Sequence, residues 1–191
     1  MKKVLNTMLL VYSIIALISC SKDVASSNPK PETDVIRSAA KSTNNNFNCT
    51  AKTVTLIAGQ NINAGTVDVT NDANYIYVKY STTNGYVLKE THLYVGKCDS
   101  VPVNKQMNPV PGRFPFISYH NKITTYLYKV PIKSIGLGNC GCIAAHAAVV
   151  KYNSNGQLID SQTGWGNGVS INPNAGNWGM KFSYCTCGGT D

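Results

Sequence analysis

Charged residues are scarce in this sequence of 191 residues. Only 14% of its residues are charged, and 9 acidic side chains stand against 17 lysine and arginine side chains. From Cys49 onward the acidic residues are Asp68, Asp72, Glu90, Asp99, Asp160 and Asp191. Most of them lie near expected turns or the terminus, whereas a glycosidase needs two carboxyl groups facing each other across a cleft. The sequence therefore argues against paired-carboxylate catalysis.

Several other signals are missing as well. No G-x-S-x-G run is present, which excludes the usual nucleophile turn of serine hydrolases. The basic residues are scattered and form no stripe interleaved with aromatic residues, so we expect no nucleic-acid partner. No other motif indicates a cofactor or a catalytic residue. We therefore expect no cofactor and favour a protein without enzymatic activity.

The clearest positive signal is the start of the chain. A basic Met1-Lys2-Lys3 precedes an apolar run, Val4–Ile18, which is too short to span a membrane and typical of a signal peptide. The run ends in Leu17-Ile18-Ser19-Cys20, which resembles the lipobox of bacterial lipoproteins. The resemblance implies cleavage before Cys20 and acylation of that residue. Several acyl chains on one residue would make a stable membrane anchor. The alternatives are an ordinary secretory signal cleaved near Ser19 and a single membrane anchor.

We accordingly divide the chain into a signal peptide (1–19), a lipidated flexible tether (20–48) and a folded domain (49–191). The tether is rich in Asn, Ser, Thr and Pro and has few large apolar residues, so no packed structure is expected. Ser21-Lys22-Asp23 resembles an incomplete surface-export signal of Gram-negative lipoproteins, which favours the outer membrane and suggests exposure at the cell surface. Without Lys2 and Lys3, 15 basic and 9 acidic residues give the mature chain a net charge of +6.

Cysteine usage indicates an oxidising compartment. Besides Cys20 the chain has six cysteines: Cys49, Cys98, Cys140, Cys142, Cys185 and Cys187. An even number in an exported chain predicts a disulfide framework, although fifteen pairings are open. We expect Cys140 or Cys142 to pair with Cys98, and the carboxy-terminal two to pair with Cys49 and the remaining member. A tetrathiolate zinc site at the two C-x-C pairs is the weaker alternative, because zinc ligands usually have wider spacing.

From Cys49 onward the pattern is that of an all-β protein. Short alternating runs recur about every ten residues, separated by turn signals, and no convincing amphipathic helix or fixed repeat is present. One of these signals, Asn84-Gly85, is typical of a β-hairpin. The most apolar run, Cys142–Tyr152, is expected to be a central strand with Ala144 and His146 on one face. A long proline-rich segment from Gly96 to about Lys122 is expected to be irregular. The prediction is an antiparallel β-sandwich or jelly roll, with a closed barrel as the alternative.

Several separated runs resemble an uncharacterised family of secreted or surface bacterial β-domains. They are Ala58–Val67, Glu90–Gly96, Gly112–Phe116, Ile143–Ala147, and Trp165-Gly166 with Asn177-Trp178. The resemblance spans roughly Thr53 to Tyr184 and implies an extracellular β-domain. It implies no enzymatic activity and assigns no catalytic residue.

Two small groups of residues could carry a function. His92, His146 and Glu90 could bind a metal if their strands are neighbours, although half-buried imidazoles with ordinary partners are the commoner case. Aromatic residues near turns could stack on a sugar, although tryptophan more often packs in a core. The ligand-binding candidates are Trp165, Trp178, Phe114, Phe116, Tyr119 and Arg113.

The sequence thus predicts a non-catalytic binding module, anchored by lipid at the outer membrane, with the long loop as its recognition surface. Its expected ligand is a glycan, a matrix component or an envelope protein. A small metal-assisted envelope hydrolase centred on His92, His146 and Glu90 is one alternative. A structural subunit of a surface assembly is the other.

Overall fold

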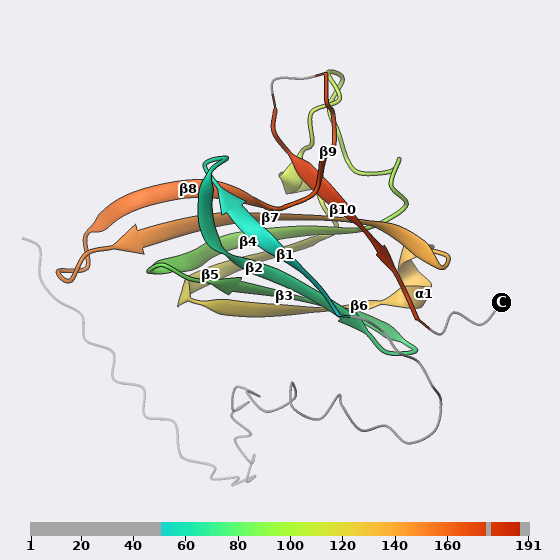
Figure 1. Ribbon diagram of the computed structural model, residues 1–191, viewed down its shortest axis with the longest axis horizontal. Coiled ribbons are helices and arrows are strands. Elements are labelled where there is room, and N and C mark those ends of the chain that lie inside the picture. Colours follow the sequence, from blue (N-terminus) through green and yellow to red (C-terminus); the bar gives the residue numbers. More distant parts are fainter. Residues whose placement is uncertain (1–50, 175–176, 188–191) are drawn as a thin grey trace, which may run out of the picture. The chain divides into compact units, whose positions relative to one another are not determined.

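The computed structural model describes residues 51–174 and 177–187 of the chain (Figure 1). The expected signal peptide (1–19), the lipidated Cys20, the tether (20–48) and Cys49 lie outside the described residues. Within the part that is described, no helix is long and apolar enough to cross a membrane.

Strands make up most of the described domain. In chain order they are β1 (Lys52–Ala58), β2 (Ile62–Asn71), β3 (Tyr75–Thr82), β4 (Tyr86–Gly96), β5 (Phe116–Ile123), β6 (Thr125–Pro131), β7 (Cys140–Tyr152), β8 (Leu158–Gly166), β9 (Val169–Ser170) and β10 (Met180–Cys185). Two single-turn helices, η1 (Pro111–Arg113) and α1 (Ile132–Ile135), lie in the connections.

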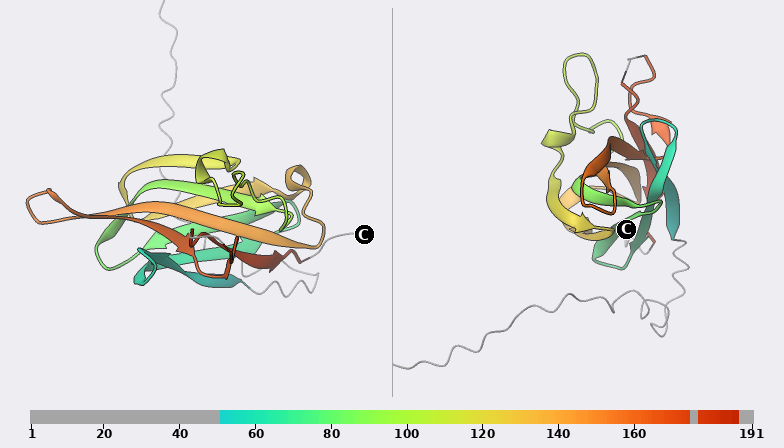
Figure 2. Two further views of the ribbon diagram at one scale, coloured as in Figure 1. Left: turned by 90° about the horizontal axis from the view of Figure 1, so that it is seen from above. Right: turned by 90° about the vertical axis from the view of Figure 1, so that its left-hand side faces the viewer.

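The strands form one antiparallel sheet with the order β5-β4-β7-β8-β1-β2-β3-β6. β10 pairs with the first residues of β7, and the short β9 pairs with β10. The two ends of this order, β5 and β6, are consecutive in the chain and separated by Thr124 alone, so the sheet curls into a nearly closed barrel (Figure 2). The all-β antiparallel prediction is confirmed, and the path of the sheet follows the barrel alternative.

Side chains connect the two ends of the sheet order. Tyr128 on β6 donates a hydrogen bond to the carbonyl oxygen of Thr91 on β4 (3.0 Å), and its hydroxyl lies 2.8 Å from Thr91 Oγ1. Thr91 Oγ1 is also 2.8 Å from Nε2 of His120 on β5. Thr91 is fully buried, and buried polar groups are tolerated when they have such partners. The interior thus joins β4, β5 and β6 through a polar network as well as through apolar contacts.

Alternation along the strands divides the apolar residues between two faces. On β7, Ile143, Ala145, Ala147 and Val149 are fully buried in the main core, whereas Ala144 belongs to a separate small cluster. On β4, Leu93 and Val95 face the main core and Tyr94 faces the small cluster. Because side chains alternate along a strand, the small cluster lies on the outer face of β4 and β7. The predicted central position of β7 and the facing of Ala144 are confirmed.

Two expectations about connections need correction. The irregular segment ends at Pro115, since residues from Phe116 onward form β5. The outward side chains of β5 include the apolar Ile117 and Tyr119, which obscured the alternation of polar and apolar residues in the sequence. Asn84 and Gly85 do form a tight turn, with positive φ values of 55° and 78°. The strands on either side nevertheless pair with other neighbours, β3 with β2 and β6 and β4 with β5 and β7, so no hairpin forms.

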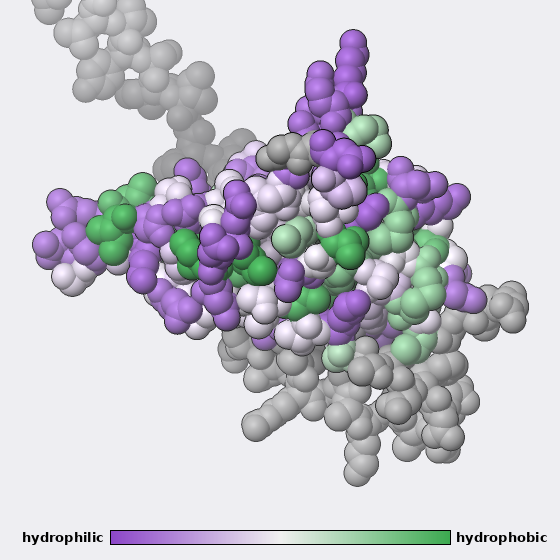
Figure 3. Space-filling view, turned by 45° about the horizontal axis from the view of Figure 1, so that its top comes forward, coloured by the Kyte–Doolittle hydropathy of each residue, from purple (hydrophilic) through white to green (hydrophobic). Residues whose placement is uncertain are grey.

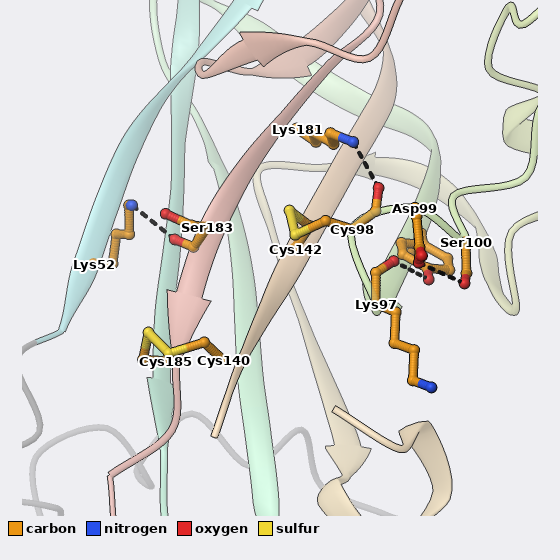
Figure 4. The surroundings of a disulfide bond; sticks show 11 residues. Lys52, Lys97, Cys98, Asp99, Ser100, Cys140, Cys142, Lys181, Ser183 and Cys185 are labelled. Atoms are coloured by element: carbon orange, nitrogen blue, oxygen red, sulfur yellow. Dashed lines mark hydrogen bonds between the residues drawn. A yellow bond between two sulfur atoms is a disulfide. The ribbon is translucent and has the colours of Figure 1, made fainter. Parts of the chain in front are cut away.

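Two disulfides fasten the beginning of β7 to its neighbours (Figure 4). Cys98, just after β4, pairs with Cys142, which confirms the expected link from Cys98 to one of these two cysteines. Cys140 pairs with Cys185 at the end of β10. Lys181 Nζ donates a hydrogen bond to the Cys98 carbonyl (2.6 Å), joining β10 to the same corner. Because these sulfur atoms are bonded to each other, they are not available as zinc ligands.

The third disulfide stays a prediction, and the positions of Cys187 and of the start of β1 support it. Cys187 has a free thiol among the described residues, and its backbone N–H donates to Asn71 Oδ1 (3.3 Å) at the end of β2. β1 runs antiparallel to β2, with Lys52 opposite Val69, and Cys49 precedes Lys52 by three residues. We expect a Cys49–Cys187 disulfide, seen as one cross-linked peptide in mass spectrometry of the unreduced full chain. Recovery of both cysteines as alkylated thiols would contradict it.

Candidate functional site

The small cluster on the outer face of the sheet organises the candidate site. Its buried members are Tyr94, Val101, Phe114, Ala144 and Trp165. The ring of Phe114 lies against Tyr94 and Trp165, with centroid distances of 6.1 and 6.2 Å. Val101 and Phe114 therefore hold the two ends of the loop between β4 and β5 against the sheet. In Figure 1 this loop and the segment between β9 and β10 project from the same side of the sheet.

The two projecting segments are fixed to each other. Asn172 donates a side-chain hydrogen bond to the Gln106 carbonyl (3.1 Å). Gly179 lies against Pro109 and Trp165, and a Cβ there would come within 2.3 Å of Pro109 Cγ. This close approach requires glycine. In Figure 3, which brings these segments forward, hydrophilic residues dominate the projecting tips and hydrophobic residues form separate small groups.

A pocket of about 520 Å³ opens between these segments and the sheet. Its lining consists of neutral polar, proline and aromatic residues: Asn108, Pro109, Pro111, His146, Thr163, Trp165, Asn177 and Trp178. Strands β7 and β8 supply the floor, and the loop and the approach to β10 supply the walls. Trp165 is almost completely buried (4% exposed), whereas Trp178 is half-buried against the small cluster.

Three rings lie in a row across β4, β7 and β8. The register places His92 opposite His146 and His146 opposite Trp165. The ring centroids are 5.3 Å apart in the first pair and 4.8 Å in the second. The sequence analysis proposed His92 and His146 as neighbours on the condition that their strands pair, and the structure brings them together.

The two histidines have different surroundings. His92 Nε2 lies 2.8 Å from Glu90 Oε1, and its Nδ1 lies 3.0 Å from the Pro111 carbonyl oxygen. His146 Nδ1 is buried and has no hydrogen-bond partner within the described part of the chain. Burial, with a smaller contribution from the charge of His92, lowers the pKa of His146 from 6.5 to about 3. His146 is therefore neutral at ordinary pH.

This arrangement is poorly suited to a metal. Both ring nitrogens of His92 already face oxygen acceptors, one of them the Glu90 carboxylate. Over residues 51–174 and 177–187, no group of three or more His, Cys, Asp or Glu side chains is placed to hold a metal ion. A metal bound by His92 would have to displace one of these two contacts.

The other sequence candidates are dispersed. Phe114 is buried (3% exposed), which corrects the expectation of an exposed aromatic tip, because its ring fills the small cluster. Phe116 is half-buried and packs against the main core. Arg113 is exposed in η1, and Tyr119 is exposed on β5. None of these four lines the pocket. His120, which falls in the segment expected to be irregular, lies on β5 against Thr91, and burial lowers its pKa.

Several lining residues were not predicted. Asn108, Pro109 and Pro111 come from the proline-rich segment that was identified as a recognition surface, but the sequence did not indicate which of its residues face a pocket. Thr163 is exposed on β8, and Asn177 was noted only as a neighbour of Trp178. The Asn108 side chain is distinctive because its Oδ1 is buried without a partner in the described protein, as is His146 Nδ1.

Comparison of the chain with protein-family models, with curated proteins and with solved structures finds no match. The function must therefore be argued from the pocket itself.

The lowered pKa of His146 predicts that the fold loses stability in acid. The unfolded chain binds a proton at this residue near pH 6.5, whereas the folded protein does so only near pH 3. The contribution is complete above pH 6.5 and declines below it, by up to about 1.4 kcal/mol per pH unit. We expect His146→Gln to flatten this decline in urea unfolding curves recorded between about pH 7 and pH 4.

His120→Gln is the comparison for this experiment. Burial also lowers the pKa of His120, but its ring has a hydrogen-bond partner in Thr91. The flattening should be larger for His146→Gln. Equal pH dependence in wild type and His146→Gln would show that His146 does not carry the effect.

Proposed function

We propose that this protein is a lipid-anchored, non-catalytic binding module of the bacterial outer membrane whose pocket binds a neutral carbohydrate. The observation that carries the proposal is the pair of buried polar atoms without partners, Asn108 Oδ1 and His146 Nδ1, both on residues that line one pocket. Leaving a buried polar atom unpaired costs about 1–3 kcal/mol, so such atoms call for an explanation.

A ligand rich in hydroxyl groups would supply what these atoms lack once a shift of the pocket side chains exposes them. A hydroxyl both donates and accepts, so it can satisfy an amide oxygen and either tautomer of a neutral imidazole. The low pKa of His146 keeps the ring neutral and therefore suited to an uncharged partner. Thr163 and Asn177 add further hydrogen-bonding groups to the lining.

The aromatic and charge content of the pocket favours the same ligand class. Indole rings of Trp165 and Trp178 border the pocket, and a flat ring can cover the apolar face of a pyranose. No Lys, Arg, Asp or Glu is among the lining residues. The net positive charge of the chain is thus carried elsewhere, which supports a neutral glycan over an acidic one.

The same lining supports binding rather than turnover. Hydrolysis of a glycosidic bond needs two carboxyl groups beside the substrate, and the pocket lining contains none. The carboxylate of Glu90 is engaged by His92. The metal-assisted hydrolase therefore has less support than the binding module. If the protein instead recognises an envelope protein or a matrix component, or has a structural role, no carbohydrate should bind in the tests below.

The proposed location draws on the sequence and the disulfides. The lipobox-like Leu17–Cys20 and the polar tether suggest a lipid anchor, and the pairs Cys98–Cys142 and Cys140–Cys185 are typical of an oxidising compartment. An anchored domain on a tether would present its pocket to glycans of the envelope or of the surroundings.

Trp178→Ala should weaken carbohydrate binding by at least about tenfold, because the half-buried indole borders the pocket. The full chain, purified in detergent, would be screened on an array of neutral and acidic glycans. The dissociation constant of the best neutral ligand would then be measured by calorimetry. Binding of acidic glycans alone would overturn the proposed ligand class.

Two matched variants accompany this measurement. Tyr119→Ala removes an aromatic ring that is 78% exposed on β5 and does not line the pocket, so binding should be unchanged. Trp178→Phe keeps an apolar ring against the small cluster and separates lost stacking area from lost folding. Thermal unfolding checks each variant. Equal weakening by Tyr119→Ala would place the ligand outside the pocket.

The anchor has its own test. We expect the chain expressed in a Gram-negative host to incorporate labelled palmitate and to fractionate with outer membranes. Cys20→Ala should abolish both, because it removes the residue that would be acylated. Incorporation of label by Cys20→Ala would contradict lipidation at this position.

A further inference from the structure

Trp178 is shared by two pockets. The second pocket, of about 340 Å³, is lined by Gln60, Ser170, Asn172, Pro173, Asn177, Trp178 and Met180. It has Asn177 and Trp178 in common with the first pocket. The half-buried indole is held in place by its packing against the small cluster. The two concavities are therefore adjacent, and one fixed aromatic side chain forms part of both.

The surroundings of Trp178 are organised by backbone and side-chain hydrogen bonds. Asn177 Oδ1 accepts from the Gly179 backbone N–H (2.9 Å), which closes a tight turn around the indole. Ile171 donates its N–H to the Gly179 carbonyl (2.8 Å), and Asn172 donates to the Gln106 carbonyl. Asn172 of the second pocket is thus connected to the loop that supplies Asn108 and Pro109 to the first. Such prior ordering reduces the entropy lost on binding.

The chemistry of the second pocket matches that of the first. Its polar members are amides and one hydroxyl, its other members are Pro173, Trp178 and Met180, and no Lys, Arg, Asp or Glu is among them. A ligand confined to one pocket would leave the other pocket, with the same neutral lining, unoccupied. A chain of sugar units is the ligand that presents the same chemistry repeatedly along its length.

We propose that the two pockets are consecutive subsites for a neutral oligosaccharide that passes over Trp178. This inference rests on the proposed function and specifies its ligand as a chain of at least two units. One unit lies in the pocket of Asn108 and His146, and the next lies in the pocket of Ser170 and Asn172. Trp178 contributes to both, so affinity depends on the number of linked units.

The experiment is a calorimetric titration of the full chain with neutral oligosaccharides of increasing length. The probes are β-1,4-linked glucose, mannose and N-acetylglucosamine series from one to about four units. In the series that binds, affinity should rise by at least about tenfold once the second subsite is occupied, and then level off. A binding series with the same dissociation constant at every length would overturn the two-subsite inference and leave the proposed function intact. No binding by any neutral series would overturn the proposed function and, with it, the subsites.

Two obstructing variants assign the subsites. Ser170→Tyr places a large side chain in the second pocket only, and Thr163→Tyr does so in the first only. Both positions are on strands, where tyrosine is well tolerated. Ser170→Tyr should remove the gain in affinity with ligand length, because the second unit can no longer be accommodated. Thr163→Tyr should weaken all lengths.

Equal loss at all lengths in Ser170→Tyr, with unfolding temperature preserved, would overturn the assignment of separate subsites. The length series of the unmodified chain needs no substitution, so the inference stays testable if a variant fails to fold.

Discussion

β7 has hydrogen-bonded neighbours along both edges and packed side chains on both faces, and the rest of the domain is arranged around it. One edge pairs with β4, and the other pairs with β10 at its beginning and with β8 towards its end. Its inner face contributes Ile143, Ala145 and Ala147 to the main core. Its outer face carries Ala144 and His146, which both pack against Trp165. Two disulfides, at Cys140 and Cys142, attach the beginning of the strand to its neighbours.

Alternation in the sequence predicted most of the sheet but not all of its strands. It put Ala144 and His146 on one face of the central strand, as the structure does. It did not predict β5, because exposed Ile117 and Tyr119 alternate with half-buried Phe116 and His120, and both faces mix apolar and polar residues in the sequence. Nor could the Asn84-Gly85 turn reveal that its flanking strands separate. A turn defines local direction, whereas pairing depends on distant residues.

The candidate site was predictable only in its parts. Trp165, Trp178 and His146 were identified from residue type and position, and the pocket brings all three together. Their roles differ in a way that the sequence did not show: Trp165 is core, Trp178 is a wall, and His146 is a floor residue with a buried nitrogen lacking a partner. The same is true of Asn108, whose unpaired oxygen becomes visible only once the loop is folded onto the sheet. Loss of partners is a property of three-dimensional packing.

The strand order also has a kinetic consequence. β1 pairs with β8, where Leu56 lies opposite Gly166, so the ring of strands cannot be completed until most of the chain is available. Pairing over such sequence distances is slow, because the entropy of closing a long loop is lost before the contacts form. An emerging chain that lacks β7 and β8 has no partner for one edge of β1 and one edge of β4. Slow completion leaves these strand edges unpaired for longer, and unpaired edges are where one chain can pair with another.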